Sequence, residues 1–259
     1  MSQNVQALFG TAVAEGALDA AAAAVLAIPD LGQQIQAGLG ISVDDVDKSE
    51  VFLVTLLVDD SGSIRQAGNE QVVRNGCNLV RKSLASSKQS DGILICVRYL
   101  NGKILMPYTP IDQAFDLDQN NYVAVGSTPL YDQSIVTLGG VVAKAQEFQN
   151  GGCSARSATL IICDGAEYGS QRYKKPSDVA KVVNGLSESH IVAFMGIDDG
   201  QTDFRKVATS MGIDAKWILT PGNSESEIRK AFAVFSQSAV RASQGANAFS
   251  QTAGGGFGA

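Results

Sequence analysis

The sequence predicts an α/β domain: a doubly wound, mostly parallel six-stranded sheet with helices on both faces. Between about residues 49 and 242, short apolar β-branched runs alternate with amphipathic stretches, and strands separated by helices form parallel sheets. Carboxylate and hydroxyl side chains directly follow two of these runs, at the strand ends where such sheets carry function. The turn Asn101-Gly102 separates the second and third runs and predicts a hairpin, so the third strand should be an antiparallel edge.

The first strand is predicted at 51–58, where a continuous apolar run is typical of a strand buried on both faces. The other predicted strands are 93–100, 103–109, 158–164, 191–197 and 216–220. Helical patterns between the strands predict helices at about 70–87, 130–149, 177–187, 202–211 and 224–241.

Two flanking segments differ from this central domain, which we place at 49–242. Residues 1–48 are Ala-rich and predict a helical N-terminal extension that is interrupted at Pro29 and Gly38–Gly40. Residues 243–259 are rich in Gly, Ala and Ser and predict a flexible tail.

The composition excludes several classes of protein. The chain has 20 basic and 26 acidic residues, a net charge of −6, which argues against a nucleic-acid partner. A single histidine, His190, excludes metal sites built from several imidazoles. The four cysteines form no C-x-x-C motif and predict reduced core thiols. The longest alanine-rich run, 20–28, is too short for a membrane span. We therefore expect a soluble cytoplasmic protein.

Three short motifs bring oxygen donors to the predicted strand ends. Asp59, Ser61 and Ser63 follow the first strand as D-x-S-x-S, and Asp164 follows the fourth. Thr128 lies in the segment G-S-T-P-L-Y-D before a helix, where Pro129 at the first helical position makes it the predicted N-cap. Five oxygen donors without nitrogen or sulfur suit Mg²⁺, with Mn²⁺ or Ca²⁺ as alternatives.

These motifs, in this order, resemble the von Willebrand factor A family and its metal-ion-dependent adhesion site (MIDAS). The resemblance covers about residues 50–240 and implies a bacterial-type intracellular member with strand order 3-2-1-4-5-6. It implies that Ser61, Ser63 and Thr128 bind Mg²⁺ directly. Asp59 and Asp164 would mainly support these ligands without contacting the metal themselves. Two departures are an extra carboxylate, Asp60, and the acid after Asp164-Gly165, which is displaced to Glu167; neither removes a ligand.

The resemblance implies a protein–protein interaction module in which a partner's Asp or Glu completes the metal site. It suggests an AAA+ ATPase or a stress-system component as partner. Loop 168–176 is basic and aromatic. The candidate partner contacts are Tyr168, Arg172 and Tyr173 of this loop, together with Tyr131 of the segment G-S-T-P-L-Y-D.

We predict no enzyme, because the motifs supply no general base or activated nucleophile. A Mg²⁺-dependent phospho-acceptor or phosphatase is a weaker alternative, since such proteins need a late-strand Lys where this chain has Asp198 and Asp199. A P-loop is absent from the sequence. A metal-independent structural assembly subunit is a third possibility, based on the Ala-rich and Gly-rich ends.

Overall fold

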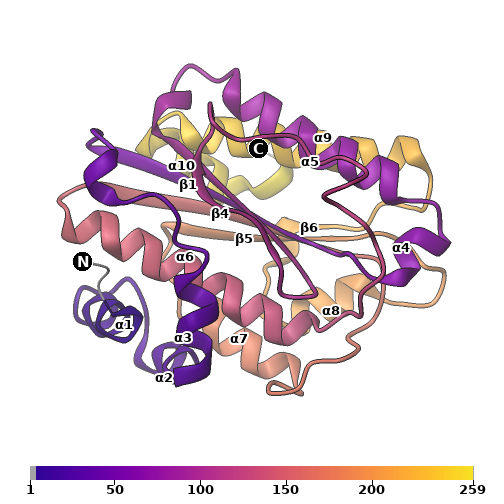
Figure 1. The fold of residues 1–259 in the computed structure, drawn as a ribbon, viewed down its shortest axis with the longest axis horizontal. Helices are drawn as coiled ribbons and strands as arrows, with labels where there is room; N and C mark the ends of the chain where they lie inside the picture. The colour runs from indigo at the N-terminus through magenta and orange to yellow at the C-terminus, as the bar shows by residue number, and fades with distance from the viewer. Residues whose placement is uncertain (1–3, 259) are drawn as a thin grey trace.

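A computed structural model describes residues 4–258 of the chain. Its centre is a six-stranded sheet in the order β3-β2-β1-β4-β5-β6 (Figure 1). All neighbouring pairs are parallel except β2 and β3, which are antiparallel. The predicted fold class, strand order and antiparallel edge are therefore confirmed. The strands are β1 (Glu50–Val58), β2 (Ile93–Tyr99), β3 (Ile104–Pro110), β4 (Ser154–Cys163), β5 (His190–Gly196) and β6 (Ile218–Leu219).

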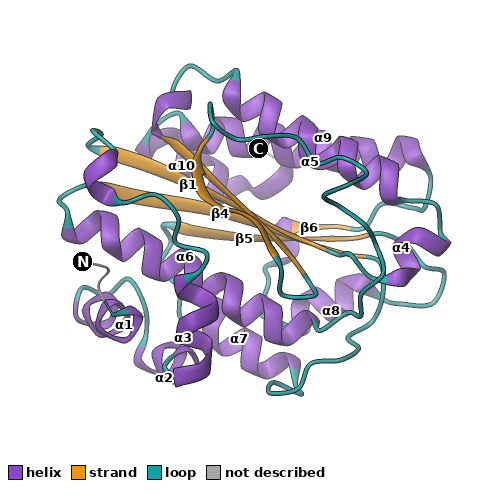
Figure 2. Cartoon of the chain, in the orientation of Figure 1, coloured by secondary structure: helices purple, strands orange, loops and turns teal. Residues whose placement is uncertain are grey.

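Helices cover both faces of the sheet (Figure 2). On one face α5 packs along α9, and α10 packs on α9; on the other, α6 packs on α7 and β4. The helices are α1 (Val5–Ala14), α2 (Ala20–Leu26), α3 (Pro29–Gln36), α4 (Gly62–Gln66), α5 (Glu70–Ala85), α6 (Leu130–Asn150), α7 (Pro176–Asn184), α8 (Phe204–Ser210), α9 (Glu225–Ser243) and α10 (Ala246–Gly255).

The two central strands are buried almost completely, as the apolar run of β1 predicted. Every residue of β1 after Glu50 is buried, and so is every residue of β4 after Ser154. A strand that is covered on both faces needs no polar alternation, which explains the continuous Val, Leu and Ile pattern. The predicted last strand is shorter than expected, because Ala215–Trp217 form a 3-10 turn before β6.

The N-terminal extension is part of the main core. Helices α1 and α3 pack on α6, and α2 packs on α7. Gly139 of α6 allows this close approach, since a Cβ there would lie 2.7 Å from Ile35 Cδ1. Farther along, the amide of Ile41 donates to the carbonyl of Tyr108 in β3 at 3.0 Å. The apolar side chains of the extension therefore cover this chain's own helices.

The segment predicted as a flexible tail is helical instead. Residues 246–255 form α10, and Phe249 is 4 % exposed, with its ring 6.4 Å from that of Phe52 in β1. Phe257 packs edge-on against Trp217, with the ring centroids 5.0 Å apart. Composition predicted little to bury, but these two aromatic side chains fix the segment on the sheet.

Truncating one of these aromatic side chains tests the docking of α10. We expect Phe249→Ala to lower the free energy of unfolding by about 3 kcal/mol, the usual cost of a buried Phe. If residues 243–259 were a flexible tail, the substitution would leave the free energy of unfolding almost unchanged. Chemical denaturation distinguishes a docked helix from a flexible tail. The control is Phe115→Ala, because the side chain of Phe115 is 49 % exposed. Equal midpoints for the two variants would contradict the docked helix.

Candidate metal centre

The first motif lies where β1 ends and α4 begins. Asp59 is fully buried, and its Oδ1 accepts the amide N–H of Ser61 at 2.8 Å. Ser61 keeps an extended backbone and precedes α4, whereas Ser63 lies in the first turn of that helix. The chain therefore turns earlier than a purely extended D-x-S-x-S would, yet the two serine hydroxyls lie 2.8 Å apart.

Asp164 joins this group from the end of the neighbouring strand β4. Its Oδ1 accepts the Ser63 hydroxyl at 2.6 Å and the Ser61 hydroxyl at 3.4 Å. Its own amide donates to Asp59 Oδ2 at 3.2 Å. Four of the five predicted donors, from two adjacent strand ends, therefore form one hydrogen-bonded group.

Thr128 reaches the same edge of the sheet through backbone pairing. Gly126 donates to the carbonyl of Asp60 at 2.8 Å and accepts from Gly62 at 3.1 Å. Two residues later Thr128, 6 % exposed, exchanges backbone hydrogen bonds with Tyr168 at 2.8 and 2.9 Å. No hydrogen bond joins its hydroxyl to the other four donors. The helix begins at Leu130 with Pro129 as N-cap, so the prediction that Thr128 is the N-cap is wrong.

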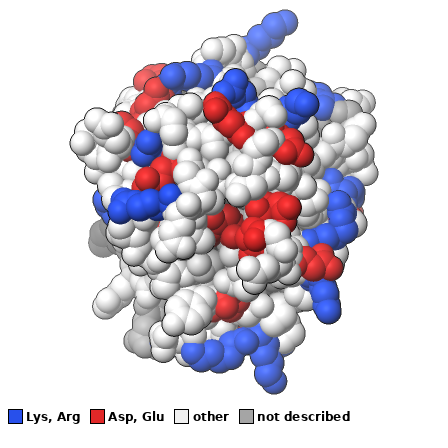
Figure 3. Space-filling view, turned by 90° about the vertical axis from the view of Figure 1, so that its right-hand side faces the viewer, with Lys and Arg blue, Asp and Glu red and all other residues white. Residues whose placement is uncertain are grey.

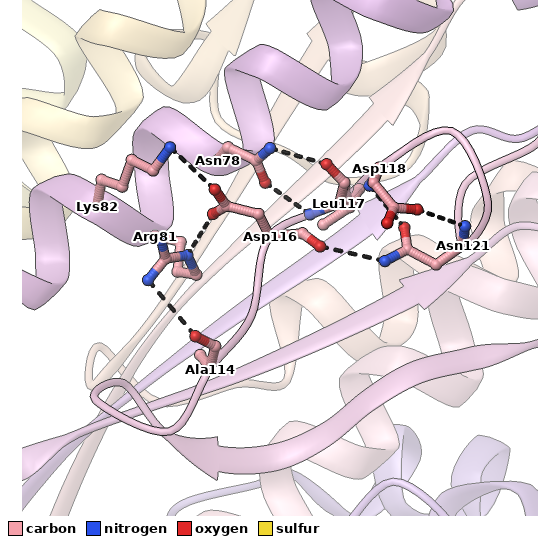
Figure 4. Close-up of polar contacts among 8 residues, drawn as sticks. All are labelled: Asn78, Arg81, Lys82, Ala114, Asp116, Leu117, Asp118 and Asn121. Carbon is pink, nitrogen blue, oxygen red and sulfur yellow. Dashed lines mark hydrogen bonds and ion pairs between the residues drawn. The ribbon is translucent and has the colours of Figure 1, made fainter.

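The long segment between β3 and α6, which carries Gly126 and Thr128, is tied to α5. Asp116 pairs with Arg81 at 2.7 Å and Lys82 at 2.9 Å, and Asn78 exchanges two hydrogen bonds with the backbone of Leu117 (Figure 4). These contacts hold a segment without regular structure against α5. They therefore help to position Gly126 and Thr128 beside the end of β1.

Burial shapes the electrostatics of the site. Desolvation raises the pKa of Asp164 to about 6, and the nearby charge of Asp59 adds to it, while the bond from Ser63 opposes it. Desolvation also raises the pKa of Asp59. Among residues 4–258 neither carboxylate forms an ion pair with Lys or Arg. Two buried carboxylates without a counter-charge favour a bound cation.

The donor set fits a hard divalent cation. It contains carboxylate and hydroxyl oxygens, the ligands of Mg²⁺, Mn²⁺ and Ca²⁺. In the described part of the chain, no three His, Cys, Asp or Glu side chains gather as a metal-binding group, so the hydroxyls of Ser61 and Ser63 must supply part of any coordination. Such a site has few charged ligands.

Asp60, the extra carboxylate, lies inside the protein. It is 1 % exposed; its Oδ1 accepts the amide of Asn101 at 3.0 Å, and its Oδ2 is buried without a hydrogen bond. Burial, followed by the charge of Asp59, raises its pKa to about 6. The carboxylate of Asp60 is therefore buried beside the site, and its hydrogen bond with Asn101 ties the β2–β3 turn to the site.

The candidate partner contacts differ in accessibility. Tyr168 is 76 % exposed beside Thr128, Arg172 is exposed and Tyr131 is half-buried. Tyr173 is 7 % exposed, and its hydroxyl donates to the carbonyl of Val25 at 2.7 Å. Tyr173 is therefore a contact between its loop and α2, and its side chain is not presented to a partner.

Two carboxylates, Glu167 and Asp132, hold this loop in place, a role that the sequence did not predict. Glu167 Oε2 accepts the amide of Tyr131 at 2.9 Å, and its Oε1 accepts that of Ser170 at 2.8 Å. The carboxylate of Asp132 accepts the backbone amides of residues 171–173. Spacing gave no signal for the bond between Glu167 and Tyr131 or for those of Asp132, because they join residues 36 to 41 positions apart.

Removing the Glu167 carboxylate tests this support. We expect Glu167→Ala to weaken metal binding about 10-fold, the usual effect of losing a residue that supports metal ligands. Thr128 would be affected because it pairs with Tyr168, the residue after Glu167. Titration calorimetry should show this loss, while Glu225→Ala, an exposed glutamate of α9, should bind like the parent chain. Unchanged affinity in Glu167→Ala would show that the loop holds its shape without this carboxylate.

Comparisons with known proteins were informative only for structure. No family model matches the sequence, and no curated protein matches it. A von Willebrand factor type A protein from Catenulispora acidiphila matches with a TM-score of 0.50 at 15 % identity, over 74 % of this chain and 43 % of that one. The fold is that of a von Willebrand factor A domain.

Two further solved structures are similar to this chain. The pilus adhesin SpaC from Lactobacillus rhamnosus GG, in its open conformation, has a TM-score of 0.53 and 12 % identity over 75 % of this chain and 30 % of its own. Proximal thread matrix protein 1 from the mussel byssus, with a zinc-occupied MIDAS motif, has a TM-score of 0.49 and 15 % identity over 75 % and 47 %. The chain spans less than half the length of each of these structures.

Proposed function

We propose that this A-domain binds a protein partner through a Mg²⁺ site formed by Asp59, Ser61, Ser63, Thr128 and Asp164. The observation that carries the proposal is the hydrogen-bonded group of two buried carboxylates and two serine hydroxyls at adjacent strand ends. The cation would neutralise the buried carboxylates and attract a partner's carboxylate. The chain itself orients the hydroxyls and excludes solvent from Asp59.

The surface around the site supports a protein partner. Val125 is 66 % exposed and Tyr168 is 76 % exposed, on the two segments that flank Thr128. Acidic side chains gather near the centre of the face that carries α4 (Figure 3). Exposed apolar groups around a charged centre are typical of interaction sites.

The proposal also covers enzymatic activity, the class of partner and the location of the protein. We infer a binding protein without enzymatic activity, because the site supplies hydroxyls and carboxylates but no imidazole or lysine base. An AAA+ ATPase or stress-system partner and a cytoplasmic location remain proposals. In support of the latter, all four cysteines are buried free thiols. None of the helices within residues 4–258 combines the length and hydropathy that a membrane crossing requires.

Calorimetric titration of EDTA-treated protein with Mg²⁺, Mn²⁺ and Ca²⁺ tests the metal, and acetate as a minimal carboxylate tests the open position. We expect saturable binding of one ion and tighter metal binding with acetate present. A chain that binds no divalent ion under either condition would contradict the proposed function and favour a metal-independent assembly subunit.

A further inference from the structure

A second site lies at the opposite end of the sheet from the metal centre. A cavity of about 390 Å³ opens beside the first residues of β5, and His190, Ile191 and Val192 line it. Trp217 and Phe249 line it from the η3 turn and from α10. The cavity is therefore framed by the two segments whose structure departed most from the sequence prediction.

The cavity occupies the place that a longer β6 would fill. β6 has only two residues, which pair with Phe194 and Met195. Residues 190–193 of β5 therefore have no strand partner on this side, within the described chain, because the preceding residues Ala215–Trp217 form a 3-10 turn instead of continuing the strand.

The register shows which backbone groups face the cavity. In a parallel strand alternate residues direct both their N–H and C=O to the same neighbour. The carbonyl of Ser189 accepts from Ser157, and the amide of Ile197 donates to Cys163, so the odd-numbered residues of β5 face β4. Val192 must therefore direct its N–H and C=O outward, and no backbone group within residues 4–258 pairs with them there.

The side chains around this edge are polarised. Trp217 and Phe249, 6 % and 4 % exposed, contribute aromatic side chains to the lining. Glu188 lines the cavity without an ion-pair partner in the described chain, whereas Lys216 is paired with Asp214 at 3.3 Å. The lining therefore combines apolar walls with one uncompensated negative charge.

His190 supplies a further polar group. It is 9 % exposed, and its Nδ1 lies 2.8 Å from the Ser157 hydroxyl. Its Nε2 has no hydrogen-bond partner among residues 4–258. Because Nε2 is not a fully buried atom, this ring nitrogen is accessible in the lining of the cavity and can hydrogen-bond to a ligand.

We propose that this groove binds an extended peptide segment of a partner protein, which adds alongside β5 and pairs with Val192. An extended backbone offers a donor and an acceptor at the spacing of a strand, which matches the unpaired groups of β5. Its side chains alternate between the two sides: apolar residues lie against Trp217 and Phe249, and a Lys or Arg faces Glu188.

A short synthetic peptide tests the groove directly. The probe is the blocked pentapeptide Val-Lys-Val-Lys-Val, and the matched control is Val-Lys-Pro-Lys-Val, which lacks the central N–H. Trp217 is the only tryptophan in the chain, so its fluorescence reports on binding. We expect saturable binding of the first peptide, about 10-fold weaker binding of the proline peptide, and slower hydrogen exchange of the Val192 amide in the complex.

Variants distinguish peptide binding in the groove from a general effect of the protein's net charge on peptide affinity. Glu188→Lys should weaken binding about 10-fold, and Ala253→Trp, which fills the cavity, should abolish it. Asp112→Lys makes the same charge change at an exposed position beyond β3 and should bind normally. EDTA should have no effect, which distinguishes this site from the metal centre. Absence of binding at millimolar peptide, equal affinity for the two peptides, or unprotected Val192 would overturn the proposal.

Discussion

Asp59→Ala and Thr128→Ala should each weaken Mg²⁺ binding by about 10- to 100-fold while the protein stays folded. The two variants remove different parts of the site. Asp59 supplies a buried negative charge and holds the amides of Ser61 and Asp164. Thr128 contributes a hydroxyl from a separate loop. Titration calorimetry of EDTA-treated protein measures both losses, and far-ultraviolet circular dichroism checks the fold.

The matched control for this experiment is Asp112→Ala, an exposed aspartate beyond β3 on the far edge of the sheet. It removes one negative charge without touching the site, and we expect its Mg²⁺ affinity to match that of the parent chain. If Asp59→Ala and Thr128→Ala both bind Mg²⁺ like this control, the site assignment is wrong. A loss in Asp59→Ala alone would leave Thr128 outside the coordination.

The central strands could be predicted because their pattern reflects burial. β1 and β4 are covered on both faces, so their sequences are continuous apolar runs, and the turn Asn101-Gly102 identified the hairpin. Their polar ends, Asp59 and Asp164, could therefore be placed side by side from sequence. Four of the five predicted donors form one hydrogen-bonded group because adjacent parallel strands end at the same edge.

The other parts of the site depend on contacts between distant segments. Nothing near Asp60 in the sequence shows that its carboxylate turns inward to Asn101. Nothing near Tyr173 shows that its hydroxyl binds Val25, nearly 150 residues earlier. Local composition likewise predicted disorder for the end of the chain, whereas Phe249 is buried against Phe52. Such contacts exist only once the tertiary fold has formed.

Asp164→Asn should stabilise the metal-free protein at neutral pH and abolish its stabilisation by Mg²⁺. Burial, reinforced by Asp59, raises the pKa of Asp164 in the folded state to about 6 from 3.8. Between these values the folded protein holds a proton that the unfolded chain has lost. The free energy of unfolding therefore falls as the pH rises through this window, and the penalty is fully present above about pH 6.

Thermal unfolding at pH 5 and pH 7.5, in EDTA and in Mg²⁺, measures this effect. His190, whose pKa burial lowers to about 4, gives a pH dependence of the opposite sign, and Asp60, with a pKa of about 6, gives one of the same sign. Both groups are present in the parent and in Asp164→Asn, so their contributions largely cancel in the difference between the two proteins. In EDTA we expect a larger decrease in Tm from pH 5 to pH 7.5 for the parent than for Asp164→Asn.

Mg²⁺ should reverse the ranking of these two proteins. A cation that binds only the folded parent raises its Tm by mass action, and it also relieves the repulsion between Asp59 and Asp164. The variant lacks one of the two buried charges and should gain little. A variant that is less stable than the parent in EDTA at pH 7.5, or that gains as much from Mg²⁺, would show that the two carboxylates are held by the fold alone. The buried acid pair would then be structural, and the raised pKa values of Asp59 and Asp164 would not indicate a metal site.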